Sequence, residues 1–197
     1  MWEDRFKAEG YLFGTAPAQF LKTHEALLTA GQSALSVADG EGRNAVFLAE
    51  KGLSVTALEY APSAIAKAEK LAKARGVEVA FHEADVLTAP FTGTYDMVLG
   101  IFIQFMGPSA RAALFDKMKQ AVAPQGLMLL HGYTPAQLAY KTGGPPQAEN
   151  MYTEALLQQA FAGWDILTCR AYEAEIREGT AHAGRSALID FIARKPV

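Results

Sequence analysis

Short apolar runs alternate with helical patterns of apolar residues along most of the chain. Residues 34–38 are mostly apolar without alternation, as in a strand that is buried on both faces. Residues 43–51 follow as a run of good helix formers, and Gly52 ends this helix. Further strands are predicted at 53–58, 77–81, 95–101, 127–133, 166–172 and 186–193, and further helices at 17–28, 62–75, 108–122 and 154–161.

Strands that alternate with helices up to residue 130 require a doubly wound, parallel sheet with right-handed crossovers. No helical pattern separates the last two strands, so we expect an antiparallel hairpin at one edge, with residues 173–185 as its connector. The expected fold class is therefore α/β, with a Rossmann-like sheet that is mostly parallel. We expect a single domain over residues 1–197, with a flap and a helix at 1–33 and the Rossmann-like core at 34–197.

The turn between the first strand and its helix carries Gly40 and Gly42. Because glycine has no Cβ, backbone N–H groups there can approach a ligand at the positive end of the helix. The spacing Gly40-x-Gly42-x-x-Ala45 fits the dinucleotide fingerprint, and Glu59 follows the second strand, where a carboxylate can accept ribose hydroxyls. The pattern predicts an adenosine cofactor and leaves open whether it is a nicotinamide dinucleotide or S-adenosylmethionine (SAM).

Three features favour SAM. No tyrosine has a lysine four residues later, which removes the usual proton-relay pair of single-domain short-chain dehydrogenases. With a single domain expected, we expect no second domain that would supply hydride-acceptor chemistry. Asp85 and Val86 follow the third strand, as a polar and apolar pair suited to bonding the adenine amino group and packing on its face.

Five segments resemble the class I SAM-dependent methyltransferases: residues 38–44, 59–62, 84–86, 95–98 and 122–126. The resemblance covers nearly the whole chain. It is closest to the small tellurite-resistance and thiopurine methyltransferase-like group, whose aromatic-glycine leader and closing pattern would correspond to residues 11–17 and 178–185. It implies a seven-stranded sheet of order 3-2-1-4-5-7-6 and SAM as the cofactor.

At three positions the chain departs from the broad family. That family often has an acidic residue where Ser36 stands, a glycine at Ala38 and a small neutral residue at Asp39. An alanine at position 38 predicts that the backbone there does not need a positive φ. Asp39 is expected either to pair with the methionine ammonium of the cofactor or to cap the following helix.

The residues expected to contact the cofactor come from the glycine loop and from the ends of the next strands. They are Ala38, Asp39, Gly40, Gly42, Asn44, Glu59, Tyr60, Asp85, Val86 and Ile101. Arg43, at the helix start, is expected to be structural or to lie near the carboxylate of the cofactor. The aromatic leader at 11–15 fits either a satellite packing cluster or a flap over the pocket.

The methyl acceptor should bind beyond the carboxyl ends of the strands. His182 is a candidate general base or anion-binding donor, and Gln104 a candidate hydrogen-bonding residue of the pocket wall. Arg177 and Arg185 are candidates for holding an oxyanion or a carboxylate. For these residues the alternative is a solvated connector without a catalytic role.

Composition and charge exclude several classes of protein. Half of the 197 residues are hydrophobic, which suffices for one sizeable core, and the net charge is −3 with scattered basic residues, which argues against nucleic acid as a partner. Residues 1–7 are too charged for a signal peptide, and no apolar run reaches the length of a membrane span. Cys169 is the only cysteine, so neither a disulfide framework nor a thiolate metal site is expected.

We therefore predict a cytoplasmic, soluble methyltransferase, monomeric or homodimeric, without a metal. It should transfer a methyl group from SAM to a small-molecule nucleophile, such as a thiol or a chalcogen oxyanion. Two alternatives remain open at this point. One is a nicotinamide-dependent reductase, and the other is a catalytically silent SAM-binding domain.

Overall fold

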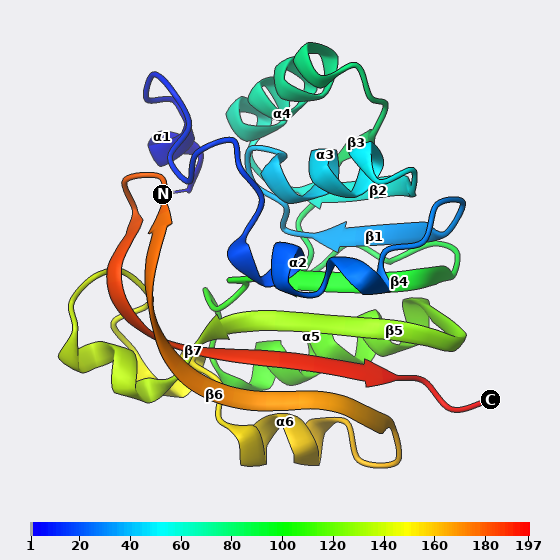
Figure 1. Cartoon of the computed structure of the whole chain (residues 1–197), viewed down its shortest axis with the longest axis vertical. Coiled ribbons are helices and arrows are strands. Elements are labelled where there is room, and N and C mark those ends of the chain that lie inside the picture. Colours follow the sequence, from blue (N-terminus) through cyan, green and yellow to red (C-terminus); the bar gives the residue numbers. More distant parts are fainter. Residues whose placement is uncertain (1) are drawn as a thin grey trace.

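Seven strands form one sheet through the middle of the molecule (Figure 1). The structure is a computed structural model that describes residues 2–197, so the first residue of the expected flap lies outside it. The strands are β1 (Ser33–Val37), β2 (Ser54–Glu59), β3 (Ala80–Glu83), β4 (Tyr95–Ile101), β5 (Val122–Tyr133), β6 (Asp165–Glu178) and β7 (His182–Arg194). The helices are α1 (Trp2–Phe6), α2 (Gln19–Thr23), α3 (Arg43–Glu50), α4 (Pro62–Arg75), α5 (Pro108–Ala121) and α6 (Glu154–Ala160), with short 3-10 turns at Glu25–Leu27, Pro135–Ala139 and Ala148–Asn150.

The strand order is β3-β2-β1-β4-β5-β7-β6. Strands β1 to β5 pair in parallel, whereas β7 pairs antiparallel with both β5 and β6. The predicted fold class, strand order and C-terminal hairpin are therefore confirmed. The order reverses between β1 and β4, and sheets of this kind bind ligands outside the carboxyl ends of the strands at such a point.

The two faces of the sheet carry separate apolar cores. Val98 of β4 packs with Leu114 of α5 in one core, which also includes residues of α6. Its neighbour Leu99 packs with Phe20 of α2 and with α3 in the other core. Successive side chains of a strand point to opposite faces, so a continuous apolar run such as β4 is needed when both faces are covered.

The hairpin at the sheet edge is longer than predicted. Strands β6 and β7 remain paired from Thr168 and Ile192 up to Glu178 and His182, so the predicted connector at 173–185 is wrong. Apolar residues at 174 and 176 alternate with polar ones, as expected for an edge strand with one covered face. The extended hairpin bends toward the N-terminal segment (Figure 1).

The helix predicted at 17–28 is interrupted. α2 ends at Thr23, and Glu25–Leu27 continues as a 3-10 turn. The residue between them is His24, whose Nε2 lies 3.2 Å from Asp190 Oδ2 on β7. The sequence pattern of this segment predicts one helix, and the helix is interrupted where His24 contacts Asp190.

Two predicted strand boundaries are also wrong. The third strand begins at Ala80 because residue 77 closes α4: the Val77 N–H donates to the Ala72 carbonyl at 3.1 Å, just after Gly76 in its left-handed conformation. The fifth strand begins at Val122, so the turn residues 124–126 lie inside it. Gln125 there has a φ of 65°, and the pairing of β5 with β4 shifts in register at this point.

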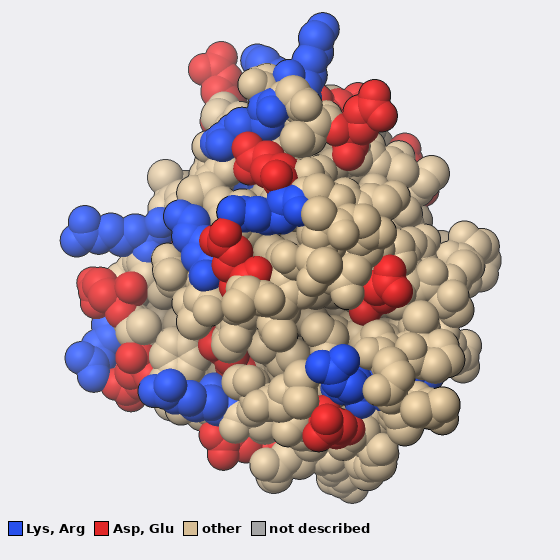
Figure 2. Space-filling view, turned by 45° about the vertical axis from the view of Figure 1, so that its right-hand side comes forward, with Lys and Arg blue, Asp and Glu red and all other residues tan. Residues whose placement is uncertain are grey.

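Charged side chains of both signs are interspersed over the face shown in Figure 2. Within residues 2–197, none of the helices combines the length and the apolar character needed to cross a bilayer.

Candidate active site

A cavity of about 290 Å³ opens at the carboxyl ends of β1, β2 and β4. Its wall consists of Trp2, Phe6, Phe13, Ala38, Asp39, Gly40, Arg43, Asn44, Glu59, Tyr60, Ala84, Asp85, Val86, Ile101, Phe102, Phe105 and His182. Nine of the ten residues predicted to contact the cofactor lie in this wall, and Gly42 does not. Of the three catalytic candidates, the wall includes only His182.

The loop after β1 turns through left-handed residues. Ala38 has a φ of 51°, so the prediction that this position does not need a positive φ is wrong. The left-handed conformation has a steric cost for alanine. The packing of the neighbouring residues must hold the backbone in this conformation. Gly40 follows with a φ of 69°, and its N–H donates to Glu59 Oε2 at 2.8 Å.

Gly42 serves helix packing in this structure. A Cβ at this position would lie 2.6 Å from the Cβ of Ala68, so the missing side chain lets α3 approach α4. Both loop glycines were expected to let the backbone approach a ligand. Only Gly40 lies in the cavity wall.

Glu59 and Asp85 present carboxylates on either side of the cavity. Glu59 is buried, and its two oxygens accept the N–H groups of Gly40 and Ala61 at 2.8 and 2.9 Å. Each oxygen retains a second lone pair that can accept a ribose hydroxyl. Asp85 is exposed and accepts the Leu87 N–H through Oδ1 only, at 2.9 Å. Both residues can thus bind an adenosine.

Some buried polar atoms without a hydrogen-bond partner belong to residues of the cavity wall. Within residues 2–197, five buried side-chain atoms have no hydrogen-bond partner: Asp39 Oδ2, Arg43 Nη1, Tyr133 OH, Tyr152 OH and His182 Nδ1. Three of them belong to the cavity wall, and the Tyr133 ring lies 5.5 Å from the His182 ring. Buried polar groups in proteins are normally paired, so this grouping points to a ligand with polar atoms of its own.

Asp39 is a buried carboxylate with one oxygen already engaged. Oδ1 accepts the Ser36 hydroxyl at 2.5 Å and the Ala45 N–H at 3.3 Å, so the residue also contacts the first turn of α3. Burial raises the pKa of Asp39 to about 6, and the nearby charge of Glu59 adds to the increase. Oδ2 remains without a partner at the cavity.

Arg43 is held by an ion pair with the tip of the hairpin. Its Nη2 donates to Glu178 Oε2 at 2.8 Å, and both side chains are buried. Glu178 Oε1 accepts the Gln19 N–H at 3.0 Å, which ties the hairpin to the start of α2. Burial alone would raise the pKa of Glu178, but the neighbouring His182 and Arg43 lower it to about 2. The carboxylate is therefore ionised at neutral pH.

His182 stands between aromatic rings. Its ring centroid lies 4.5 Å from that of Phe13 and 4.3 Å from that of Phe102, and its Nδ1 lies 4.0 Å from Glu178 Oε2. Burial lowers the pKa of His182, and the charge of Arg43 acts in the same direction against the opposing effect of Glu178. The imidazole is consequently neutral at pH 7 and can accept a proton.

The other acceptor-site candidates lie outside the cavity wall. Both polar atoms of the Gln104 side chain bind the backbone of Tyr133, at 2.7 and 2.8 Å, so this amide fixes the end of β5. Arg177 is exposed on the opposite face of β6 from Glu178. Arg185 pairs with Glu173 on the outside of the hairpin. Neither Arg177 nor Arg185 lies in the cavity wall, so neither can bind an anionic methyl acceptor there.

Sequence reasoning missed two aromatic residues of the N-terminal segment, Trp2 and Phe6. They lie four positions apart on α1, a spacing that places them on one face of a helix and was the available signal. Together with Phe13 they pack on Ala61 at the start of α4 while also lining the cavity. These rings therefore both pack against α4 and line the cavity, and the role of the leader at 11–15 as a flap stays a prediction.

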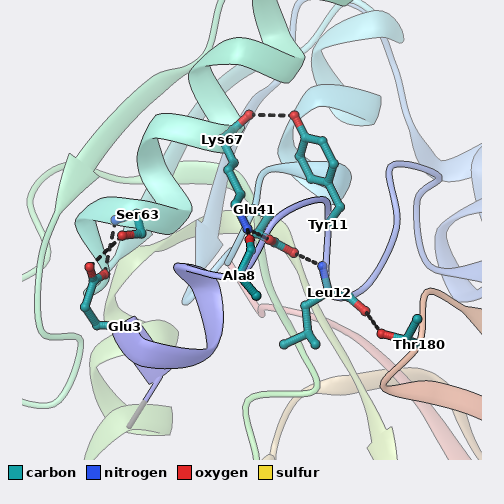
Figure 3. A network of polar contacts seen from close by, with 8 residues as sticks. All are labelled: Glu3, Ala8, Tyr11, Leu12, Glu41, Ser63, Lys67 and Thr180. Atoms are coloured by element: carbon teal, nitrogen blue, oxygen red, sulfur yellow. Dashed lines mark hydrogen bonds and ion pairs between the residues drawn. The ribbon is translucent and has the colours of Figure 1, made fainter.

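A polar network fastens this segment to α4 (Figure 3). The buried Glu41 accepts the Leu12 N–H at 2.7 Å and Lys67 Nζ at 2.8 Å, and Lys67 also donates to the Ala8 carbonyl at 2.8 Å. At the other side, Thr180 of the hairpin turn donates its N–H to the Leu12 carbonyl at 3.1 Å. The cavity wall therefore depends on contacts among three distant parts of the chain.

Lys67→Met is expected to loosen the N-terminal segment, because Glu41 then stays buried without its cation. We expect faster hydrogen exchange in residues 8–16 and a dissociation rate of the demethylated cofactor, S-adenosylhomocysteine (SAH), raised about threefold to fivefold, on the order of 1 kcal/mol. Exchange mass spectrometry and stopped-flow fluorescence measure these quantities. Lys70→Met, an exposed change on the same helix, is the matched control and should leave both unchanged.

The seven-stranded sheet, its antiparallel edge hairpin and a cavity at the switch point define the fold of the class I methyltransferases. Residues 34–126 match the family model described as a methyltransferase domain. This segment is therefore similar to a methyltransferase domain.

Comparison with known proteins agrees with this class. A demethylmenaquinone methyltransferase from Thermus thermophilus is 34% identical over 113 residues, which are 56% of this chain and 51% of that protein. The chain spans about half the length of the curated relatives it matches.

Solved structures show the same fold. One, described as "Conversion of a Disulfide Bond into a Thioacetal Group during Echinomycin Biosynthesis", superposes with a TM-score of 0.79 at 21% identity, covering 99% of this chain and 90% of that chain. TehB from Haemophilus influenzae superposes with a TM-score of 0.72 at 16% identity, covering 90% of this chain and 61% of that chain. At such identities the likeness concerns the fold, so membership of the tellurite-resistance or thiopurine group stays a prediction.

Proposed function

We propose that the protein transfers a methyl group from SAM to a small-molecule nucleophile. The observation that carries this proposal is the pair of unsatisfied, oppositely charged groups in one wall, Asp39 Oδ2 and Arg43 Nη1. A zwitterionic amino acid, such as the methionine end of SAM, complements them with its ammonium and its carboxylate. Glu59 and Asp85 are then available for the ribose and the adenine.

Charge favours SAM over a dinucleotide in this cavity. Three carboxylates line it, Asp39, Glu59 and Asp85, against a single arginine, Arg43, whose Nη2 is paired with Glu178. A pyrophosphate at the same loop would meet the unpaired carboxylate of Asp39, whereas a sulfonium cation is attracted to it. These contacts support a methyltransferase over the nicotinamide-dependent reductase.

The inner wall supports an acceptor with an apolar body and a neutral nucleophile. When bound, the cofactor supplies an electrophilic methyl group, and the protein must align the acceptor and exclude water. Phe13 and Phe102 provide aromatic contact beside His182, whose neutral imidazole can take a proton from a thiol or a phenol. The adjacent Glu178 carboxylate stabilises the imidazolium that this transfer would produce.

Isothermal titration calorimetry with SAM, SAH and NAD tests the cofactor. Binding of SAM and SAH without binding of NAD is the expected result, and the reverse would overturn the proposal. Turnover is then followed with isotopically labelled SAM and a panel of aryl thiols, phenols and chalcogen oxyanions. SAM binding without turnover of any member would favour the silent SAM-binding domain.

Glu59→Gln is expected to weaken SAH binding about tenfold, because an amide offers one acceptor oxygen where the carboxylate offers two. The retained oxygen can still accept one of the two backbone N–H groups that Glu59 holds. Calorimetry gives the affinity, and circular dichroism verifies the fold. An affinity within twofold of the wild type would show that Glu59 does not bind the ribose.

His182→Asn is expected to lower kcat about tenfold at pH 7 and to leave SAH affinity within twofold. This result is expected if His182 takes the proton from the substrate that is methylated. The wild-type kcat should fall below pH 6.5, through the lowered pKa of His182, because protonation removes the base. Initial rates from pH 5 to 8 give this profile. An unchanged profile in the variant, or equal losses of kcat and SAH affinity, would contradict the role.

A further inference from the structure

A second cavity lies between α2 and the concave face of the β6–β7 hairpin. Its volume is about 250 Å³, and it shares no wall residue with the cofactor cavity. Glu178 lines this second cavity, while its ion-pair partner Arg43 lines the first. A single buried salt bridge therefore stands between the two spaces.

Most β6 side chains in the wall of the second cavity come from one face of the strand, and Glu175, from the other face, also lines it. Arg170, Tyr172, Ile176 and Glu178 share one face of β6, and Arg177 lies on the other. Tyr172 and Ile176 are partly or fully buried there, whereas Arg170 is exposed at the mouth. The interior of the second cavity is therefore lined by an aromatic and an aliphatic side chain, and its opening carries an exposed arginine.

The interior ends in a carboxylate that is fully engaged. Asp190 Oδ1 accepts His131 Nδ1 at 2.8 Å and the Tyr172 hydroxyl at 2.9 Å, and Oδ2 lies 3.2 Å from His24 Nε2. When Nδ1 donates its hydrogen to Asp190, Nε2 of an uncharged imidazole at position 131 carries a lone pair. No hydrogen bond joins Nε2 to the residues 2–197, and His131 belongs to the wall of the second cavity.

Apolar rings and side chains surround that acceptor. Phe20 stacks on His131 with centroids 4.9 Å apart and an interplanar angle of 13°. Ile176 and Leu188 complete the apolar part of the wall. A flat apolar ligand fits such walls, and a cavity of about 150 Å³ is already enough for a benzene ring.

The mouth offers a free cation. The Arg170 guanidinium lies 5.7 Å over the Tyr172 ring and forms no ion pair with the carboxylates of residues 2–197. Its cross-strand partner is Asp190, whose carboxylate already receives three donors. Arg170 can therefore bind a carboxylate from outside the chain.

We propose that this second cavity binds a monocyclic aromatic hydroxy acid. The hydroxyl donates to His131 Nε2, the ring lies between Phe20 and the hairpin, and the carboxylate binds Arg170. This proposal does not rest on the proposed methyl transfer: the two cavities share no wall residue, although Glu178 of the second cavity pairs with Arg43 of the first.

Calorimetry with 4-hydroxybenzoate tests the site on the wild type, Arg170→Gln and Arg177→Gln. We expect saturable 1:1 binding to the wild type, about tenfold weaker binding to Arg170→Gln and unchanged binding to Arg177→Gln, which alters an exposed arginine on the opposite face of the same strand. Benzoate, which lacks the hydroxyl donor, should bind about tenfold more weakly than 4-hydroxybenzoate. Equal affinities for the wild type and Arg170→Gln, or no saturable binding at millimolar concentration, would overturn the proposal.

A second titration in saturating SAH locates the ligand. Affinity for 4-hydroxybenzoate should persist, because the two cavities are separate. Loss of binding by competition would place the compound in the cofactor cavity and overturn this site. Failure of SAH to bind at all would count against the proposed methyl transfer and would leave the 4-hydroxybenzoate comparison of the two arginine variants unaffected.

Discussion

Asp39→Asn is expected to stabilise the free protein by about 2–3 kcal/mol at pH 8 and to weaken SAM binding about tenfold or more. The stability gain follows from burial, because the pKa of Asp39 rises from its ordinary value of 3.8 to about 6. A displacement of that size corresponds to about 3 kcal/mol against the ionised form. Asparagine keeps the Oδ1 contacts with Ser36 and Ala45 and removes the charge.

The sign of the pH dependence follows from proton binding. Between pH 4 and pH 6 the folded protein holds a proton on Asp39 that the unfolded chain has lost, so stability falls as the pH rises. The loss is complete above pH 6, where both states are ionised. The variant and the wild type should therefore be equally stable near pH 4 and differ most at pH 7–8.

Urea unfolding at pH 4 and pH 8 measures the stability difference, and calorimetry measures the affinity. Weaker SAM binding is expected because an amide NH₂ would face the methionine ammonium where the carboxylate oxygen Oδ2 now stands. Asp116→Asn, which changes an exposed carboxylate, should alter neither quantity measurably. If the variant gains no stability at pH 8, the ionised Asp39 carboxylate does not destabilise the folded protein.

The central sheet could be predicted because its signal is local. β4 coincides with the strand predicted at 95–101, since a strand covered on both faces has an apolar run, here from residue 97 on. The ends of the hairpin could not be predicted in the same way. Residues 173–178 pair with β7 only because the two strands share a register, and register is a tertiary property.

The same distinction applies to the site. Glu59 ends β2 and Asp85 lies two residues after β3, so the topology alone gathers them at one edge. Arg177 and His182 were predicted together in a connector, but strand pairing puts one side chain outside and the other inside the cavity. The left-handed turn at Ala38 carries no sequence signal, because alanine is not typical of that conformation.

Gly42→Ala is expected to destabilise the free protein by about 3 kcal/mol. The residue has a φ of 90°, and a Cβ would lie 2.6 Å from the Cβ and 2.8 Å from the Cα of Ala68. The second distance involves backbone, so relief requires α3 and α4 to separate. Gly76→Ala is the matched control: its φ is 68°, nothing lies within 4 Å of its Cβ, and about 1 kcal/mol is expected.

Urea unfolding of the two glycine variants without cofactor separates two roles of the glycine loop. If Gly42 serves the contact between α3 and α4, its substitution costs more than that of Gly76 even when no ligand is present. If it serves only the approach of a ligand, the two variants unfold alike and the difference appears solely in SAH affinity. The cavity wall includes Gly40 and omits Gly42, so we expect the first outcome. In that case the fingerprint spacing reports in part how closely two helices pack, which explains why it does not by itself distinguish one adenosine cofactor from another.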